Sequence, residues 1–150
     1  MKQEKQLLLQ DLSARLSHGL IVSTTKGNGH LCSINQTIFG NEYGVNIEAT
    51  KRDYFNDNEC DIKPYLRPMS SMTKEETKEL FKEIGFEFTC NTCGIPAHYN
   101  YEFAEQIKGI PTITNVEFIK VIDWLNAHHF DYRGLIEKGL ALEAPEGMYN

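Results

Sequence analysis

The chain has 150 residues and a formal charge of −6 at pH 7, and it contains eight Phe, seven Tyr and one Trp. This aromatic content argues against a disordered chain, and the acidic charge disfavours broad electrostatic binding to nucleic acid. No apolar run is long enough to cross a bilayer, and residues 1–12 do not resemble a signal peptide. We therefore expect a cytoplasmic protein with no membrane partner, whose four cysteines are thiols or metal ligands rather than disulfides.

Residues 3–16 have the spacing of an amphipathic helix. Leu8, Leu12 and Leu16 recur on one side of it, and Gly19 is a favourable residue just after its end. The sequence predicts an N-terminal helix that buries one face.

Alternating β-branched and apolar residues predict a sheet after this helix. Residues 20–25 form a first strand, the turn-prone residues 27–29 suggest a hairpin, and residues 30–39 form the return strand. A third strand is expected around residues 43–47, with room for a fourth near Ile62.

Residues 51–61 are polar and turn-prone, which predicts a surface loop. Asp57, Glu59 and Asp61 alternate there as calcium ligands can, but the glycine and the terminal glutamate of an EF-hand loop are absent. A solvated loop is the better interpretation. Residues 64–68 follow as an extended connector between two prolines.

Two capping boxes predict helix starts further along the chain. Thr73 with Glu76 opens a helix that should end at Gly85, and Thr114 with Glu117 opens another. Between these helices, residues 86–103 show a period near two, which indicates a second hairpin.

The helix after Thr114 should face the core with one apolar stripe, made of Phe118, Ile122, Leu125 and His129. Asp131 can cap a second, short helix over residues 132–138, and Gly139 can end it. Leu140 and Leu142 then suggest a short extended segment.

These elements predict an α+β fold with an N-terminal helix, a small antiparallel sheet that could curl toward a barrel, and two to three packed helices toward the C-terminus. We expect a single domain, 1–150, in which residues 86–110 could be a hairpin insertion.

Two strings, IKPYLRPMSSMT at residues 62–73 and HHFDYRGLIEKGLALEAPEGMY at residues 128–149, resemble a family of small uncharacterised proteins of gut Bacteroidales, their phages and their mobile elements. The family has no assigned activity. The resemblance therefore implies a phage-borne or mobile-element accessory protein and assigns no catalytic residue.

The most specific chemical motif is Cys90-Asn91-Thr92-Cys93-Gly94, whose spacing is that of half a zinc knuckle. A tetrahedral site needs two further ligands, and the candidates are His98, Cys60, Cys32, His128 and His129. We take Cys90, Cys93 and His98 as the candidate zinc ligands. Two reduced cysteines in a turn are the simpler alternative, and a redox pair is disfavoured because no helix follows.

His128, His129 and Asp131 could bind a metal or perform acid–base chemistry. The structural alternative is stronger, because His129 continues an apolar face and Asp131 caps a helix. Residues 116–138 could also form a helix-turn-helix, although core packing explains that pattern better. Alternating aromatic residues at 99–103 could stack on bases but more often line a core.

We therefore expect a non-catalytic accessory protein that acts by binding another protein. The residues expected to contact it are Tyr65, Arg67, Asp131 and Arg133. One alternative is a small zinc-stabilised module that binds nucleic acid or a nucleic-acid enzyme, and another is a small metal-dependent hydrolase that uses His129 and Asp131.

Overall fold

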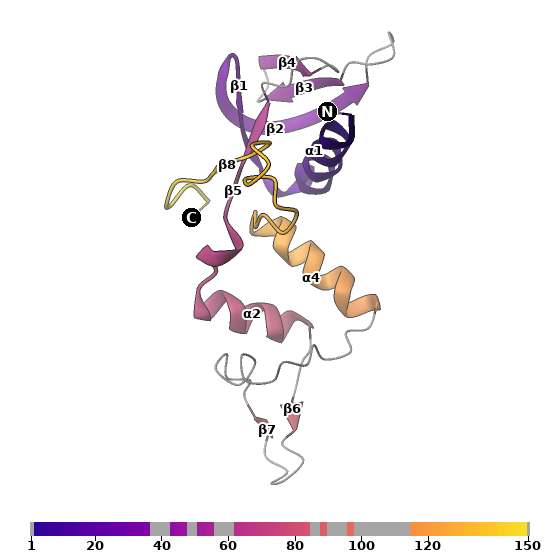
Figure 1. Cartoon of the computed structure of the whole chain (residues 1–150). Coiled ribbons are helices and arrows are strands. Elements are labelled where there is room, and N and C mark those ends of the chain that lie inside the picture. Colours follow the sequence, from indigo (N-terminus) through magenta and orange to yellow (C-terminus); the bar gives the residue numbers. More distant parts are fainter. Residues whose placement is uncertain are drawn as a thin grey trace. The chain divides into compact units, whose positions relative to one another are not determined.

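A computed structural model describes the backbone of residues 2–36, 43–47, 51–55, 62–84, 88–89, 96–97 and 115–149. The chain forms two compact units, the first made of Met1–Met69 with Leu125–Asn150 and the second of Ser70–Trp124. Figure 1 shows their helices and strands. The α+β class is confirmed, whereas the expectation of a single domain stays a prediction.

The first unit begins with helix α1, Lys2–Arg15, followed by the short 3-10 helix η1, Leu16–His18. Gly19 ends this segment in the left-handed conformation, with φ of 70°, where a residue without Cβ is favoured. The predicted N-terminal helix is confirmed. Figure 1 shows α1 lying beside the sheet.

The sheet of the first unit has six strands in the order β4-β3-β2-β1-β5-β8. They are β1, Ile21–Thr24; β2, Gly27–Gln36; β3, Tyr43–Ile47; β4, Lys51–Phe55; β5, Lys63–Leu66; and β8, Leu142–Glu143. Neighbouring strands are antiparallel, except for β5 and β8, which are parallel. The sheet is open, with β4 and β8 at its edges, and does not curl into a barrel.

The first hairpin turns earlier than the sequence suggested. Thr24 pairs with Gly27, so the turn is the two residues between them, and Gly27 already belongs to β2. The Thr24 hydroxyl donates to the Gly27 carbonyl at 2.8 Å and accepts from the Lys26 amide at 3.1 Å. Gly27 takes φ of 107°, so the glycine is needed at the closing pair of the turn.

The expectation of a surface loop over residues 51–61 is wrong for its first half. Residues Lys51–Phe55 form β4, which pairs with β3 from Ile47↔Lys51 to Tyr43↔Phe55. Their polar sequence is compatible with an edge strand, because one of its sides has no neighbouring strand to pair with. The calcium alternative at residues 57–61 lies outside the described residues.

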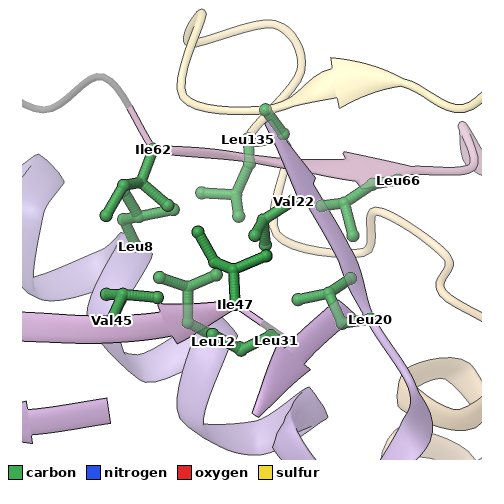
Figure 2. Packing of buried hydrophobic residues seen from close by; sticks show 11 residues of the cluster. Leu8, Leu12, Leu20, Val22, Leu31, Val45, Ile47, Ile62, Leu66 and Leu135 are labelled. Carbon is green, nitrogen blue, oxygen red and sulfur yellow. The ribbon is translucent and has the colours of Figure 1, made fainter. Parts of the chain in front are cut away.

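A cluster of buried apolar side chains lies between α1, the sheet and the C-terminal segment (Figure 2). Its members, each 4% exposed or less, are Leu8, Leu12, Leu20, Val22, Leu31, Val45, Ile47, Ile62, Leu66, Leu135 and Ala141. Burial of a Leu, Ile or Val side chain contributes about 1.5–3 kcal/mol relative to exposure. This core fixes the positions of the polar groups described below.

The second unit contains helix α2, Lys74–Ile84, and a two-stranded sheet of β6, Phe88–Thr89, and β7, Pro96–Ala97. The predicted capping box is confirmed, since the Thr73 amide donates to Glu76 at 2.9 Å and the Glu76 amide donates to the Thr73 hydroxyl at 3.2 Å. The second hairpin is confirmed at Phe88↔Ala97 and Thr89↔Pro96. A further short 3-10 helix, η2, is Met69–Ser71.

Helix α4, Asn115–Ala127, is the helix predicted after Thr114, but its apolar stripe is only partly buried. Phe118 is 57% exposed and Ile119 is 59% exposed, whereas Trp124 and Leu125 are buried. The prediction of a core-facing Phe118 is therefore wrong, because periodicity places residues on one face without showing which turns of that face are covered. No helix within the described ranges combines the length and apolarity that a bilayer crossing needs.

The predicted second helix over residues 132–138 does not form. Gly134 has φ of 67°, which interrupts a right-handed helix. Only one turn follows it, and this turn ends at Gly139, which has φ of 69°. The Gly139 and Leu140 amides donate to the Ile136 and Leu135 carbonyls at 2.9 Å each, as in a Schellman motif. The helix-turn-helix alternative fails because it needs this second helix.

Candidate functional site

A buried ion pair lies on the core-facing side of α1. Asp11 and Arg15 are both fully buried, and they lie on the same face as Leu8 and Leu12 because residues three and four apart are neighbours on a helix. Arg15 donates from Nε to one Asp11 oxygen at 2.9 Å and from Nη2 to the other at 3.0 Å. This two-point contact satisfies the carboxylate with a fixed geometry.

The same guanidinium ties α1 to the end of α4. Arg15 Nη2 donates to the Phe130 carbonyl at 2.7 Å, and Nη1 donates to the Leu125 carbonyl at 3.4 Å. Carbonyls at the C-terminal end of a helix carry partial negative charge, so a cation is favourable there. Arg15 therefore joins two segments that are 110 residues or more apart in sequence.

Tyr132 and Arg133 complete this polar cluster. The Arg15 and Arg133 guanidinium carbons lie 5.4 Å and 5.1 Å from the centroid of the Tyr132 ring, which is within cation–π range. The Tyr132 hydroxyl donates to Asn126 Oδ1 at 3.0 Å, and Arg133 Nε lies 3.4 Å from Asp11 Oδ1. We call Asp11, Arg15, Asn126, Tyr132 and Arg133 the Arg15 cluster.

His129 ends α4 in an unusual backbone conformation. Its φ is 61°, the one positive value at a non-glycine residue within the described ranges. The His129 amide donates to the Asn126 carbonyl at 3.2 Å, and the Phe130 amide donates to the Leu125 carbonyl at 3.0 Å. These two bonds form a Schellman motif in which His129 takes the position that glycine usually occupies. The prediction that His129 continues the helical stripe is therefore wrong.

The His129 ring is enclosed among cationic groups. It is 4% exposed, its ring centroid lies 3.8 Å from that of Tyr149 in a stacked arrangement, and its Nδ1 has no hydrogen-bond partner among the described residues. Burial, followed by the neighbouring Arg15, His18 and His128, lowers the pKa of His129 from 6.5 to about 4. A hydrogen bond with the His18 backbone opposes these effects only in part. The imidazole is therefore neutral at pH 7.

The Tyr149 hydroxyl joins two strands of the sheet. It accepts from the Ile21 amide at 3.1 Å and donates to the Tyr65 carbonyl at 2.7 Å. Strands β1 and β5 pair at Val22↔Pro64, so the next position of the same register would place Ile21 opposite Tyr65. The hydroxyl bridges that pair. Burial raises the pKa of Tyr149 to about 12, so the hydroxyl keeps its proton at any ordinary pH.

The structure joins two of the four predicted interaction residues, Arg67 and Asp131, by a backbone hydrogen bond. Arg67 forms an isolated bridge with Phe130, with its amide donating to the His129 carbonyl and its carbonyl accepting from the Asp131 amide, each at 2.8 Å. Its guanidinium carbon lies 4.3 Å from the centroid of the Phe130 ring. Tyr65, two residues earlier, accepts at its hydroxyl from Asn28 Nδ2 at 3.1 Å.

Asp131 is buried, at 7% exposure, although it was expected to contact a partner. Its two oxygens accept from the Leu135 and Ile136 amides at 2.8 Å each, so the predicted cap is real but serves one turn and not a helix. Arg133 is half-buried in the Arg15 cluster. The side chains of Asp131 and Arg133 therefore make contacts that stabilise the fold.

The candidate zinc ligands Cys90, Cys93 and His98 lie outside the described residues, as does Cys60. Cys32 is exposed, and His129 is enclosed by the stack with Tyr149. Within the described part of the chain, no group of three His, Cys, Asp or Glu side chains could hold a metal ion.

Neither the Arg15 cluster nor the stack of His129 on Tyr149 was expected from the sequence. The signal for the Arg15 cluster was present, because Asp11 and Arg15 fall on the helical face of Leu8 and Leu12 with the spacing of an ion pair. Nothing local in the sequence indicates Tyr149, because its hydrogen-bond partners lie 84 and 128 residues away.

Comparisons with protein-family models, curated proteins and solved structures find no match to this chain.

Proposed function

We propose that this chain is a non-catalytic accessory protein that acts by binding another protein. It would belong to a phage or a mobile element, the setting that the family resemblance implies. The observation that carries the proposal is that the candidate acid–base groups are bonded within the fold. Asp131 accepts hydrogen bonds from two backbone amides, Asp11 is paired with Arg15, and His129 is buried.

The same observation argues against the hydrolase alternative. A general base must reach the proton it abstracts, and its pKa works best near the operating pH. His129 is buried with a pKa of about 4, and the oxygens of Asp131 already accept backbone amides instead of orienting the imidazole.

Charge and exposure support a protein partner over nucleic acid. The net charge of −6 repels phosphate backbones. Phe118 and Ile119 are adjacent apolar residues that each expose more than half of their side chains, and a protein partner would cover them.

Reciprocal purification from the natural host tests the proposal. We expect one protein to be recovered repeatedly with the tagged chain, and to recover the chain when it is tagged in turn. The complex should survive nuclease treatment and raised salt, because phosphate contacts weaken steeply with salt and apolar contacts do not. Loss of the partner after nuclease treatment, or repeated recovery of the chain alone, would contradict the proposal.

A zinc-stabilised module remains a second candidate, and the β6–β7 pair favours it. The pairing Thr89↔Pro96 brings together the two ends of the segment that carries Cys90 and Cys93, as a knuckle requires. Untagged protein purified without chelator should then contain one zinc ion per chain. The metal should be lost in a Cys90→Ser, Cys93→Ser variant and retained in the control Cys32→Ser, whose thiol is exposed. Well-folded wild-type protein without zinc would exclude this candidate.

A further inference from the structure

The contact between His129 and Tyr149 combines a buried titratable ring with the attachment of the C-terminal segment. The two rings stack at 3.8 Å, and the Tyr149 hydroxyl bridges Ile21 of β1 and Tyr65 of β5. A change at His129 can therefore reach the sheet through one side chain.

Protonation of the His129 imidazole is unfavourable in its buried position. A protonated His129 would carry an N–H at Nδ1, and that atom is buried without an acceptor. Leaving a buried donor without a partner, and burying a charge, are both strongly unfavourable. Protonation therefore requires the ring to reach water.

The charged groups around His129 add to this cost. Arg15 of α1, His18 of η1 and the adjacent His128 all oppose a positive charge on the ring. The Asp11 carboxylate is bound to Arg15, and that of Asp131 is bound to two backbone amides. From β5, the Arg67 guanidinium lies over the Phe130 ring, and β1 carries no titratable side chain.

Tyr149 is the part of this enclosure that can move at least cost. The His129 backbone is fixed by bonds to Asn126 and Arg67, whereas residues 145–149 are exposed or half-buried. The last sheet contact before them is the Ala144 amide, which donates to the Leu66 carbonyl at 2.8 Å. Beyond it, the Tyr149 ring and hydroxyl attach the segment to the sheet.

We propose that His129 and Tyr149 form an acid-sensitive latch, in which protonation of His129 opens the ring stack and releases residues 145–149 from the β1–β5 pair. At neutral pH the latch is closed. In acid the Tyr149 hydroxyl leaves the Ile21 amide and the Tyr65 carbonyl, which water then solvates, while the sheet stays folded.

Hydrogen exchange at the Ile21 amide reports the latch directly, because this amide donates to the Tyr149 hydroxyl. After correction for intrinsic exchange rates, its protection should fall about 20-fold between about pH 7 and about pH 5, if the released imidazole titrates near its ordinary value. The Leu31 amide, which donates to the Leu20 carbonyl at 2.8 Å, should keep its protection.

Two variants separate the latch from general acid sensitivity. A His129→Phe variant keeps a ring for the stack and should lose the pH dependence at Ile21, whereas His30→Gln, at an exposed histidine, should keep it. A parallel loss of protection at Ile21 and Leu31 would overturn the proposal, as would constant protection at Ile21 in wild-type protein. The wild-type comparison decides the matter even if a variant fails to fold.

Discussion

At the scale of single residues, the Tyr149 hydroxyl satisfies two backbone groups that the sheet leaves apart. The Ile21 amide and the Tyr65 carbonyl both use it as their partner. Buried backbone groups are almost always paired, and leaving one unpaired costs about 1–3 kcal/mol. This hydroxyl therefore contributes to stability through groups on two other segments.

A Tyr149→Phe substitution should lower the free energy of unfolding by about 1–3 kcal/mol, because the ring stays and only the bridging hydroxyl is lost. The matched control is Tyr65→Phe, which removes an exposed hydrogen bond to Asn28 and should cost about 0.5 kcal/mol or less. Denaturant unfolding of both variants measures the difference. Equal costs would show that the hydroxyl bridge adds nothing.

At the scale of elements, α1 is held to the end of α4 by Arg15, whose charge is balanced by Asp11. Removal of one member of a buried pair leaves the other charge uncompensated, which costs about 3–5 kcal/mol. Replacement of both members by apolar residues of similar size is often much less harmful. The ion pair thus determines where α1 contacts the end of α4 more than it adds to the free energy of unfolding.

A double-mutant cycle at this pair tests that interpretation. Asp11→Leu should destabilise the protein by about 3–5 kcal/mol, and the double variant Asp11→Leu, Arg15→Met should be more stable than the single Asp11→Leu variant. Thermal or denaturant unfolding of the two single variants, Asp11→Leu and Arg15→Met, and of the double variant provides the coupling energy. Additive costs would contradict the account, because the two groups would then act independently.

Elements with local signals were predictable from the sequence. The periodicity of leucines located α1, and the Thr73 and Glu76 spacing located the start of α2. One wrong prediction depended on a strand elsewhere in the chain, and another depended on the backbone conformation of a residue within the predicted helix. Lys51–Phe55 is a strand because β3 pairs with it, and residues 132–138 are not a helix because Gly134 takes a positive φ.

The polar site was less predictable than the fold because several of its contacts join residues that are far apart in sequence. Asp131 was expected to cap a short helix, and its side chain caps a single turn instead, since a cap needs only nearby amides. The stack of His129 on Tyr149 joins residues whose proximity depends on the path of the whole C-terminal segment. No periodicity or spacing in the sequence indicates such a contact.

At the scale of the whole molecule, the depressed pKa of His129 makes stability depend on pH. The unfolded chain binds this proton near pH 6.5 and the folded chain near pH 4, so the unfolded state holds more protons between these values. The contribution of His129 to stability is therefore complete above about pH 6.5 and is lost as the pH falls toward 4.

Unfolding free energies of wild-type protein and of His129→Phe should show this dependence. The difference between them should change by about 3 kcal/mol from neutral pH to about pH 4, which corresponds to the shift of the His129 pKa. Wild-type protein should lose stability relative to the variant as the pH falls. The same pH profile in both proteins would rule out His129 as the cause.

The central claim is that this fold uses its candidate acid–base groups for structure, which is the observation that supports the proposed binding function. A histidine titration of the intact protein by NMR, with the His129 resonance assigned by substitution, tests that claim most directly. The account predicts that His129 titrates well below its ordinary pKa of about 6.5, because the ring is sealed against Tyr149 at neutral pH. Titration of His129 near pH 6.5 would contradict it, because the ring would then be open to water and available for proton transfer.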